Sequence, residues 1–193
     1  AFGFPLNSGR ILMLILHIIT TALIFMISKK ITRSTVAASI AALVFAFSPL
    51  AASMQRVVYM EHIMIVWLLA SFYLAAGEKR TLFHYYASAL FFGLAFLTEE
   101  SAIFFLPALL YTVYVSSDKH HRRFATALFV AIAILLASFY PLYAQMKQEL
   151  FPEGTALGGD FPHVSLIERL SERGPDTGRV LDYGSGLAAA IQQ

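Results

Sequence analysis

Long apolar runs separated by short polar connections make up most of the first 145 residues of the sequence. Each run holds roughly 16–23 residues, and an α-helix needs about 20 apolar residues to cross the hydrocarbon core of a bilayer. The pattern therefore predicts an all-α, polytopic transmembrane bundle of about six spans. We place the spans at residues 10–28, 36–54, 61–77, 82–98, 101–116 and 124–145.

The last part of the chain has a different pattern. Residues 147–193 are rich in Gly, Pro and charged side chains, which are typical of turns and loops. We therefore divide the chain into a transmembrane helical domain, residues 1–146, and a loop segment, residues 147–193. Because the chain begins at Ala1 and ends just after the apolar stretch "GLAAAI", we expect it to be an internal piece of a longer protein.

The distribution of charge predicts an orientation. Short loops rich in Lys and Arg stay in the cytoplasm. Three alternate connections hold only two of the 12 acidic residues but eight of the 14 basic ones, namely Lys29, Lys30, Arg33, Lys79, Arg80, Lys119, Arg122 and Arg123. The turns near residues 55–60 and 98–101, and residues 147–193, are then extracytoplasmic. We predict an integral protein of the plasma or inner membrane, or of the endoplasmic reticulum in a eukaryote.

Composition supports the membrane interpretation. The chain is 58% hydrophobic and 13% charged, whereas a soluble domain has about 45–50% apolar and about 25% charged residues. The absence of cysteine excludes disulfides and thiolate metal sites, and no His, Asp or Glu spacing predicts a metal site. We expect the lipid bilayer as a partner and no nucleic acid.

Charged residues near the outward ends of the spans are the candidates for function, because ionisable groups are costly at membrane depth. Arg56, Glu61 and His62 border the turn between the second and third spans. A simpler alternative is that Glu61 interacts with a helix dipole, worth about 0.3–1 kcal/mol, while Arg56 extends to the lipid headgroups.

Glu99 and Glu100 fill the turn between the fourth and fifth spans. The fifth span would measure only about 24 Å as an α-helix, which places this turn below the membrane surface or thins the bilayer there. Two adjacent acids at such a depth need a compensating cation or base. The alternative is that Thr98 caps the fifth span and that both acids occupy its favourable first turn.

Two stretches together resemble a known family. "RVVYMEHIMIVWLLASFYLA" and "GLAFLTEESAIFFLPALLYTVY" are similar to the membrane core of GT-C type glycosyltransferases, in particular protein O-mannosyltransferases and aminoarabinose transferases. The resemblance covers residues 10–145. It rests on a Ser-Pro followed by an outward Arg–Glu turn and on a G-L-A-x-x-T pattern, here Ser48, Pro49, Arg56, Glu61, Gly93, Leu94, Ala95 and Thr98.

The resemblance implies transfer of a sugar from a polyprenyl-phosphate carrier to a protein, glycan or lipid acceptor on the extracytoplasmic face. The acidic residue that acts in this family lies in the first outward loop, which would precede Ala1, so we assign no catalytic base and expect this piece to be inactive alone. We predict Arg56, Glu61, His62, Glu99 and Glu100 as substrate-binding residues. Arg56 would stabilise the phosphate leaving group, whereas Glu99 stands where the family has Lys.

No cofactor is expected beyond the lipid-linked donor; a divalent cation is compatible with this chemistry, but no sequence feature points to one. Two other functions remain open. A transporter or flippase core would show inverted repeats and paired charges near the bilayer midplane. A non-catalytic membrane assembly subunit would explain a chain without a complete active site.

Overall fold

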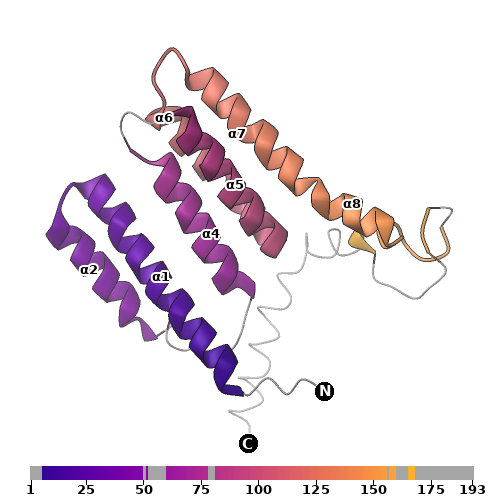
Figure 1. Cartoon of the computed structure of the whole chain (residues 1–193), viewed down its shortest axis with the longest axis horizontal. Helices are drawn as coiled ribbons and strands as arrows, with labels where there is room; N and C mark the ends of the chain where they lie inside the picture. Colours follow the sequence, from indigo (N-terminus) through magenta and orange to yellow (C-terminus); the bar gives the residue numbers. More distant parts are fainter. Residues whose placement is uncertain are drawn as a thin grey trace, which may run out of the picture. The chain divides into compact units, whose positions relative to one another are not determined.

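The computed structural model describes residues 6–49, 51, 60–77, 81–155, 157–159 and 165–167, and within this part of the chain all regular structure is helical. This confirms the all-α prediction. The helices are α1 (Leu6–Thr32), α2 (Thr35–Ala46), α4 (Met60–Ala75), α5 (Leu82–Thr98), the 3₁₀ helix η1 (Glu100–Phe105), α6 (Leu106–Ser116), α7 (Arg122–Ala137) and α8 (Phe139–Met146) (Figure 1). They divide into two compact units, residues Ala1–Ala137 and Ser138–Gln193.

Helices of the first unit lie side by side in a bundle. α1 packs between α2 and α4, α4 packs on α5, and α5 packs on α7, while α6 contacts both α4 and α7 (Figure 1). Two helical segments, Gly9–Thr32 and Arg122–Met146, are long and apolar enough to cross a membrane. Only 17% of each apolar window is buried, whereas the core helix of a soluble protein would be mostly buried. The span count of six stays a prediction.

Many large apolar side chains of the first unit face outward, while alanines pack at the helix interfaces beside a few buried aromatic rings such as those of Phe92 and Phe129. Ala38, Ala89 and Ala125 are fully buried, whereas Phe104 is 81% exposed and Phe47 is 80% exposed. Small residues at helix interfaces and large apolar residues outside are typical of membrane bundles, where lipid solvates the exterior and helices associate through close packing. The chain is therefore an integral membrane protein.

Helix α2 ends earlier than the apolar pattern predicts. It stops at Ala46, and the N–H groups of Phe47 and Ser48 donate to the carbonyls of Leu43 and Phe45. Pro49 explains the break, because its ring would collide with the carbonyl four residues earlier, that of Phe45, and because a residue before proline avoids the helical conformation. The predicted span to residue 54 is thus interrupted at its Ser-Pro.

Helices α4 and α5 form an antiparallel hairpin that is joined by a buried pair of serines. The Ser71 hydroxyl donates to the Ser88 carbonyl at 2.8 Å, and the Ser88 hydroxyl donates to the Ser71 carbonyl at 2.9 Å. Both side chains are fully buried. The reciprocal bonds satisfy two hydroxyls that would be costly to leave unpaired in an apolar interior, and they fix the register of the hairpin.

A 3₁₀ segment lengthens the fifth predicted span. η1 and α6 form one apolar stretch of 17 residues, Glu100–Ser116. Six 3₁₀ residues rise about 12 Å and eleven α-helical residues rise about 16 Å, so the stretch measures about 28 Å, close to the hydrocarbon thickness of about 30 Å. Pro107 accounts for the 3₁₀ geometry, since it cannot donate the α-helical hydrogen bond to Ile103. The stretch is longer than the α-helix of about 24 Å that the sequence suggested, but it is one of the shorter apolar helices of the described part of the chain. The depth of its first turn in the membrane stays a prediction.

The second unit is described separately. It begins with α8, whose C-cap is Lys147. Turns follow, in which the N–H of Gly159 donates to the carbonyl of Gln148 and that of Leu166 donates to the carbonyl of Glu149. A hydrogen bond that Lys147 donates to the Tyr143 side chain raises the pKa of Lys147, with smaller contributions from the charges of Tyr143 and Glu149. The extracytoplasmic location of residues 147–193 stays a prediction.

Candidate functional site

The register of the α4–α5 hairpin brings the predicted acidic residues to one end of the first unit. Ser71 lies opposite Ser88, and the two helices run antiparallel with the same rise per residue. Ten residues back along α4 and ten forward along α5 lead to Glu61 and Thr98. The start of α4 and the end of α5, where Glu99 follows, are therefore neighbours.

A second contact joins η1 to the same end of α4. The Ser101 hydroxyl lies 3.4 Å from the Met64 sulfur, in hydrogen-bond geometry. Met64 is three residues after Glu61 and is buried, and Ser101 directly follows Glu100. The structure thus gathers Glu61, Glu99 and Glu100 at one end of the hairpin, although they are up to 39 residues apart in the sequence.

The local backbone determines how the acids are presented. Glu61 is exposed in the first turn of α4, and Glu100 is half-buried in the first turn of η1, where carboxylates interact favourably with the helix dipole. Glu99 is extended, with φ −154° and ψ 125°, and its N–H donates to the Ala95 carbonyl while its carbonyl accepts from the N–H of Ala102. Glu99 therefore terminates α5 and caps η1 through its backbone.

Thr98 does not act as the predicted cap. It is the last residue of α5, and its hydroxyl donates backward to the Leu94 carbonyl at 2.8 Å. The reason is that α5 continues through Thr98, so the hydroxyl binds a carbonyl of its own helix instead of an N–H of the next one. The turn is held by the backbone of Glu99 and not by the Thr98 hydroxyl.

Of the two remaining predicted site residues, the structure describes His62 but not Arg56. His62 follows Glu61 in the first turn of α4 and is half-buried, so it belongs to the same end of the hairpin. Arg56 lies outside the described residues. We define the outer acidic end as Glu61, His62, Glu99 and Glu100.

The chemistry of the outer acidic end is that of hydrogen-bond acceptance. Carboxylates accept hydrogen bonds from hydroxyl groups, and an imidazole can donate or accept. Among the residues that the structure describes, no three His, Asp or Glu side chains are close enough to hold a metal ion. Side chains of these types can bind the hydroxyl groups of sugars or of hydroxyl acceptors.

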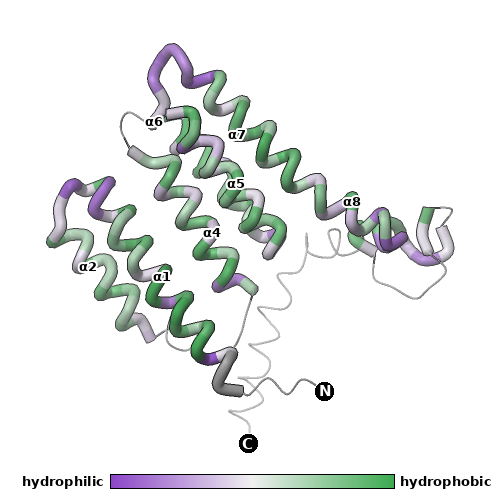
Figure 2. The backbone as a smooth tube through the Cα atoms, in the orientation of Figure 1, coloured by the Kyte–Doolittle hydropathy of each residue, from purple (hydrophilic) through white to green (hydrophobic). Residues whose placement is uncertain are grey.

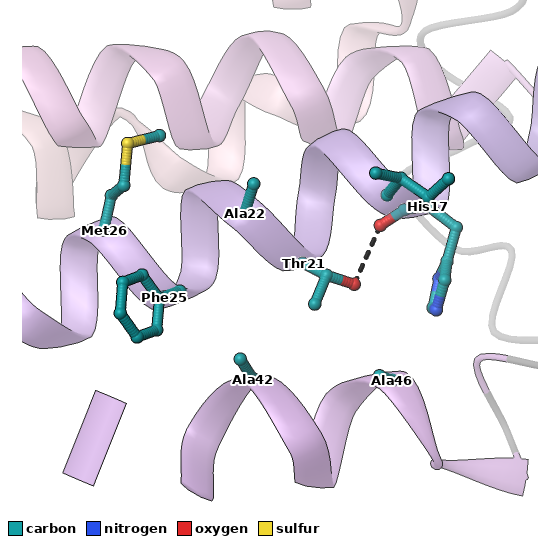
Figure 3. A pocket seen from close by; sticks show the side chains of 8 residues that line it. His17, Thr21, Ala22, Phe25, Met26, Ala42 and Ala46 are labelled. Atoms are coloured by element: carbon teal, nitrogen blue, oxygen red, sulfur yellow. Dashed lines mark hydrogen bonds between the residues drawn. The ribbon is translucent and has the colours of Figure 1, made fainter. Parts of the chain in front are cut away.

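An apolar groove that the sequence did not predict lies between α1 and α2. Its volume is about 500 Å³, and Figure 3 shows side chains of both helices around it. His17 stacks on Phe45 with ring centroids 5.1 Å apart, and the Thr21 hydroxyl donates to the His17 carbonyl at 2.8 Å. The groove is lined by His17, Ile18, Thr21, Ala22, Phe25, Met26, Ala42 and Ala46.

One sequence signal could have revealed the groove. Ala42 and Ala46 are four residues apart and therefore share one face of α2. Small side chains on that face leave space opposite the larger residues of α1 (Figure 3). The lining is apolar apart from the imidazole and one hydroxyl, so the groove is suited to hydrocarbon and is separate from the outer acidic end.

Comparison with known proteins gives one match. A family model described as dolichyl-phosphate-mannose-protein mannosyltransferase matches residues 1–144. The matched range includes every described helix of the first unit and all the residues of the outer acidic end, as well as Arg56. No curated protein and no solved structure matches the chain.

Proposed function

Because the chain belongs to the dolichyl-phosphate-mannose-protein mannosyltransferase family, we propose that it binds a polyprenyl-phosphate sugar and transfers the sugar to an acceptor on the extracytoplasmic face. The family places the chain among membrane glycosyltransferases of the GT-C kind. The identity of the donor, the acceptor and the membrane face are the parts that we propose.

The observation that carries the proposal is the family match over the same helices that gather the acids. Glu61 from α4 and Glu99 and Glu100 from the α5–η1 turn come to one end of the hairpin through the serine register and the Ser101–Met64 contact. The basic connections lie at the opposite ends of these helices. Since basic short loops remain cytoplasmic, this arrangement supports an outward-facing substrate site.

The charges suggest a division of roles between the predicted site residues. Carboxylates repel a phosphate, so we assign Glu61, Glu99 and Glu100 to the hydroxyl groups of the sugar or the acceptor, together with His62. We assign Arg56 to the phosphate of the departing polyprenyl phosphate, because a cation stabilises the charge that develops on a leaving group. The catalytic base stays unassigned.

The experiment uses the full-length protein, reconstituted in vesicles with a radiolabelled polyprenyl-phosphate sugar and, in parallel, the corresponding nucleotide sugar. We expect label to appear in an acceptor only with the lipid-linked donor. Movement of the labelled donor across the bilayer without transfer would identify a flippase. If the protein binds the labelled donor but neither transfers the sugar nor moves the donor across the bilayer, the chain is a non-catalytic subunit and the proposal is wrong.

A further inference from the structure

Six cations lie at the end of the first unit opposite the outer acidic end. Three lie in the last turn of α1 and in the connection to α2, and three lie in the connection between α6 and α7 and in the first turn of α7. Figure 2 shows both regions as hydrophilic segments along one edge of the bundle. The same stretches contain one acid, Asp118, so their formal net charge is 6 − 1 = +5. We define the basic rim as Lys29, Lys30, Arg33, Lys119, Arg122 and Arg123.

Cations of the basic rim lie against aromatic rings of the helices. Lys30 Nζ is 4.2 Å from the centre of the Tyr73 ring, and it also donates to the Tyr73 carbonyl at 2.6 Å. The Arg122 guanidinium is 4.6 Å from the Tyr114 ring centre, and Lys29 Nζ is 5.9 Å from that of Phe25. Aromatic and basic residues together mark the headgroup level of a membrane, so the rim lies at that level.

Local backbone preferences oppose the positions of two of these cations. Arg33 has φ +54°, in the left-handed region where glycine is favoured and other residues are strained. Arg122 stands in the first turn of α7, which contains no acid, although cations are unfavourable beside the positive end of a helix dipole. Both elements therefore carry a cation where the local conformation would favour another residue.

This observation separates the rim from a simple orientation signal. The orientation of a membrane protein depends on how many Lys and Arg residues its short loops contain, and not on their backbone positions. Residues at locally unfavourable positions are expected where a functional site offsets the local cost. The exposed Lys119 and Arg123 extend the same surface into the interfacial plane, where the anions present are lipid headgroups.

We propose that the basic rim is a docking surface for the phosphodiester headgroups of anionic phospholipids. The rim binds them by charge complementarity, with Lys30 and Arg122 held on aromatic rings and Lys119 and Arg123 open to the headgroup layer. This function is independent of sugar transfer, since the rim and the outer acidic end occupy opposite ends of the helices.

Native mass spectrometry of the full-length protein measures the proposal directly, with phosphatidylglycerol and phosphatidylcholine as the probes. We expect tighter binding of phosphatidylglycerol, and the double variant Lys119→Gln/Arg123→Gln should weaken it about tenfold or more, since each cation near an anionic surface contributes about fivefold. Binding of phosphatidylcholine should not change. The charge-conserving variant Lys119→Arg/Arg123→Lys should bind phosphatidylglycerol like the wild type.

A matched control removes the same charge elsewhere. Arg10→Gln/Lys147→Gln also neutralises two exposed cations, and neither belongs to the rim. This variant should keep the wild-type affinity for phosphatidylglycerol. The proposal is overturned if the rim variant binds phosphatidylglycerol as tightly as the wild type, if the control loses as much affinity, or if inorganic phosphate displaces the lipid at equal concentration.

Discussion

Gly93 lies where α5 packs closely against Leu136 of α7. A Cβ atom added there would be 2.6 Å from the Leu136 Cβ, closer than real contacts allow. The same glycine begins the G-L-A-x-x-T pattern that suggested the family, and its neighbour Ala95 is fully buried. The structure therefore gives part of this family pattern a packing role, which a sequence alone cannot distinguish from a role in substrate binding.

Gly93→Ala should destabilise the bundle. Alanine favours a helix over glycine by about 0.5–1 kcal/mol, but overpacking a core costs about 1–3 kcal/mol, so we expect a net loss and a lower Tm. Thermal unfolding in detergent measures it. Leu136→Gly removes the Cβ that the added methyl would meet, so it should cost less stability in the Gly93→Ala background than in the wild type. A Gly93→Ala protein as stable as the wild type would contradict the close packing of α5 on α7.

Arg56 is the residue whose proposed role is the most specific. If it stabilises the departing phosphate, Arg56→Ala should lower kcat/KM of the full-length enzyme about 10²- to 10³-fold, the scale for removing one preorganised group. The amount of folded protein should change little. A fall in yield that matches the fall in activity would instead indicate a structural role, and Arg56→Lys should recover part of the activity only in the first case.

The helices show what the sequence could predict and what it could not. The apolar pattern located the helices well, because the cost of exposing polar groups to lipid acts on whole segments. It did not reveal where α2 ends or that η1 is a 3₁₀ helix. Both depend on a proline, Pro49 or Pro107, acting on the carbonyl four residues earlier, an effect that hydropathy does not contain.

The sequence did not predict the register of the α4–α5 hairpin either. It depends on two serines that no sequence pattern singles out. Their mutual hydrogen bonds and the Ser101–Met64 contact place Glu61 at the same end of the hairpin as Glu99 and Glu100. The sequence predicted the site residues of each turn separately and did not show that the two turns are neighbours. Their proximity required the three-dimensional pairing of the helices.

A double-mutant cycle tests the serine pair. Ser71→Ala and Ser88→Ala should each destabilise the fold, and the double variant should lose less than the sum, because each single change leaves one hydroxyl with fewer partners. Interhelical hydrogen bonds in membranes contribute about 0.6 kcal/mol on average, so we expect a coupling of that order. Unfolding in mixed micelles measures it, and additive losses would refute the paired geometry.

The whole molecule has a polarity that follows from its charges, with the basic rim at one end of the first unit and the outer acidic end at the other. The absence of native cysteine makes single introduced cysteines clean reporters of this polarity. Thr32, Asp118 and Thr155 are exposed, whereas Ser117 is buried and donates to the Val113 carbonyl, so the first three are the suitable positions.

Thr32→Cys and Asp118→Cys should react with a membrane-impermeant maleimide only from the cytoplasmic side, and Thr155→Cys only from outside. The reason is that basic loops are retained in the cytoplasm. Intact cells expose the outer side of the protein to the reagent, and inverted vesicles expose the cytoplasmic side. Labelling of Thr155→Cys from the cytoplasm, or of Thr32→Cys from outside, would reverse the orientation and with it the assignment of the acidic end to the outer face.

The central claim is that the outer acidic end holds the substrates of sugar transfer. The most direct test is the initial rate of transfer from a polyprenyl-phosphate sugar by the full-length enzyme carrying Glu99→Gln and Glu100→Gln. We expect the rate to fall about tenfold to hundredfold, since small errors in substrate position have effects of about that size, while Tm stays close to that of the wild type. The control variant Glu149→Gln/Glu153→Gln removes two exposed acids of the second unit and should keep the wild-type rate. A Glu99→Gln/Glu100→Gln enzyme that transfers sugar at the wild-type rate would contradict the claim and reduce both acids to helix-terminal charges.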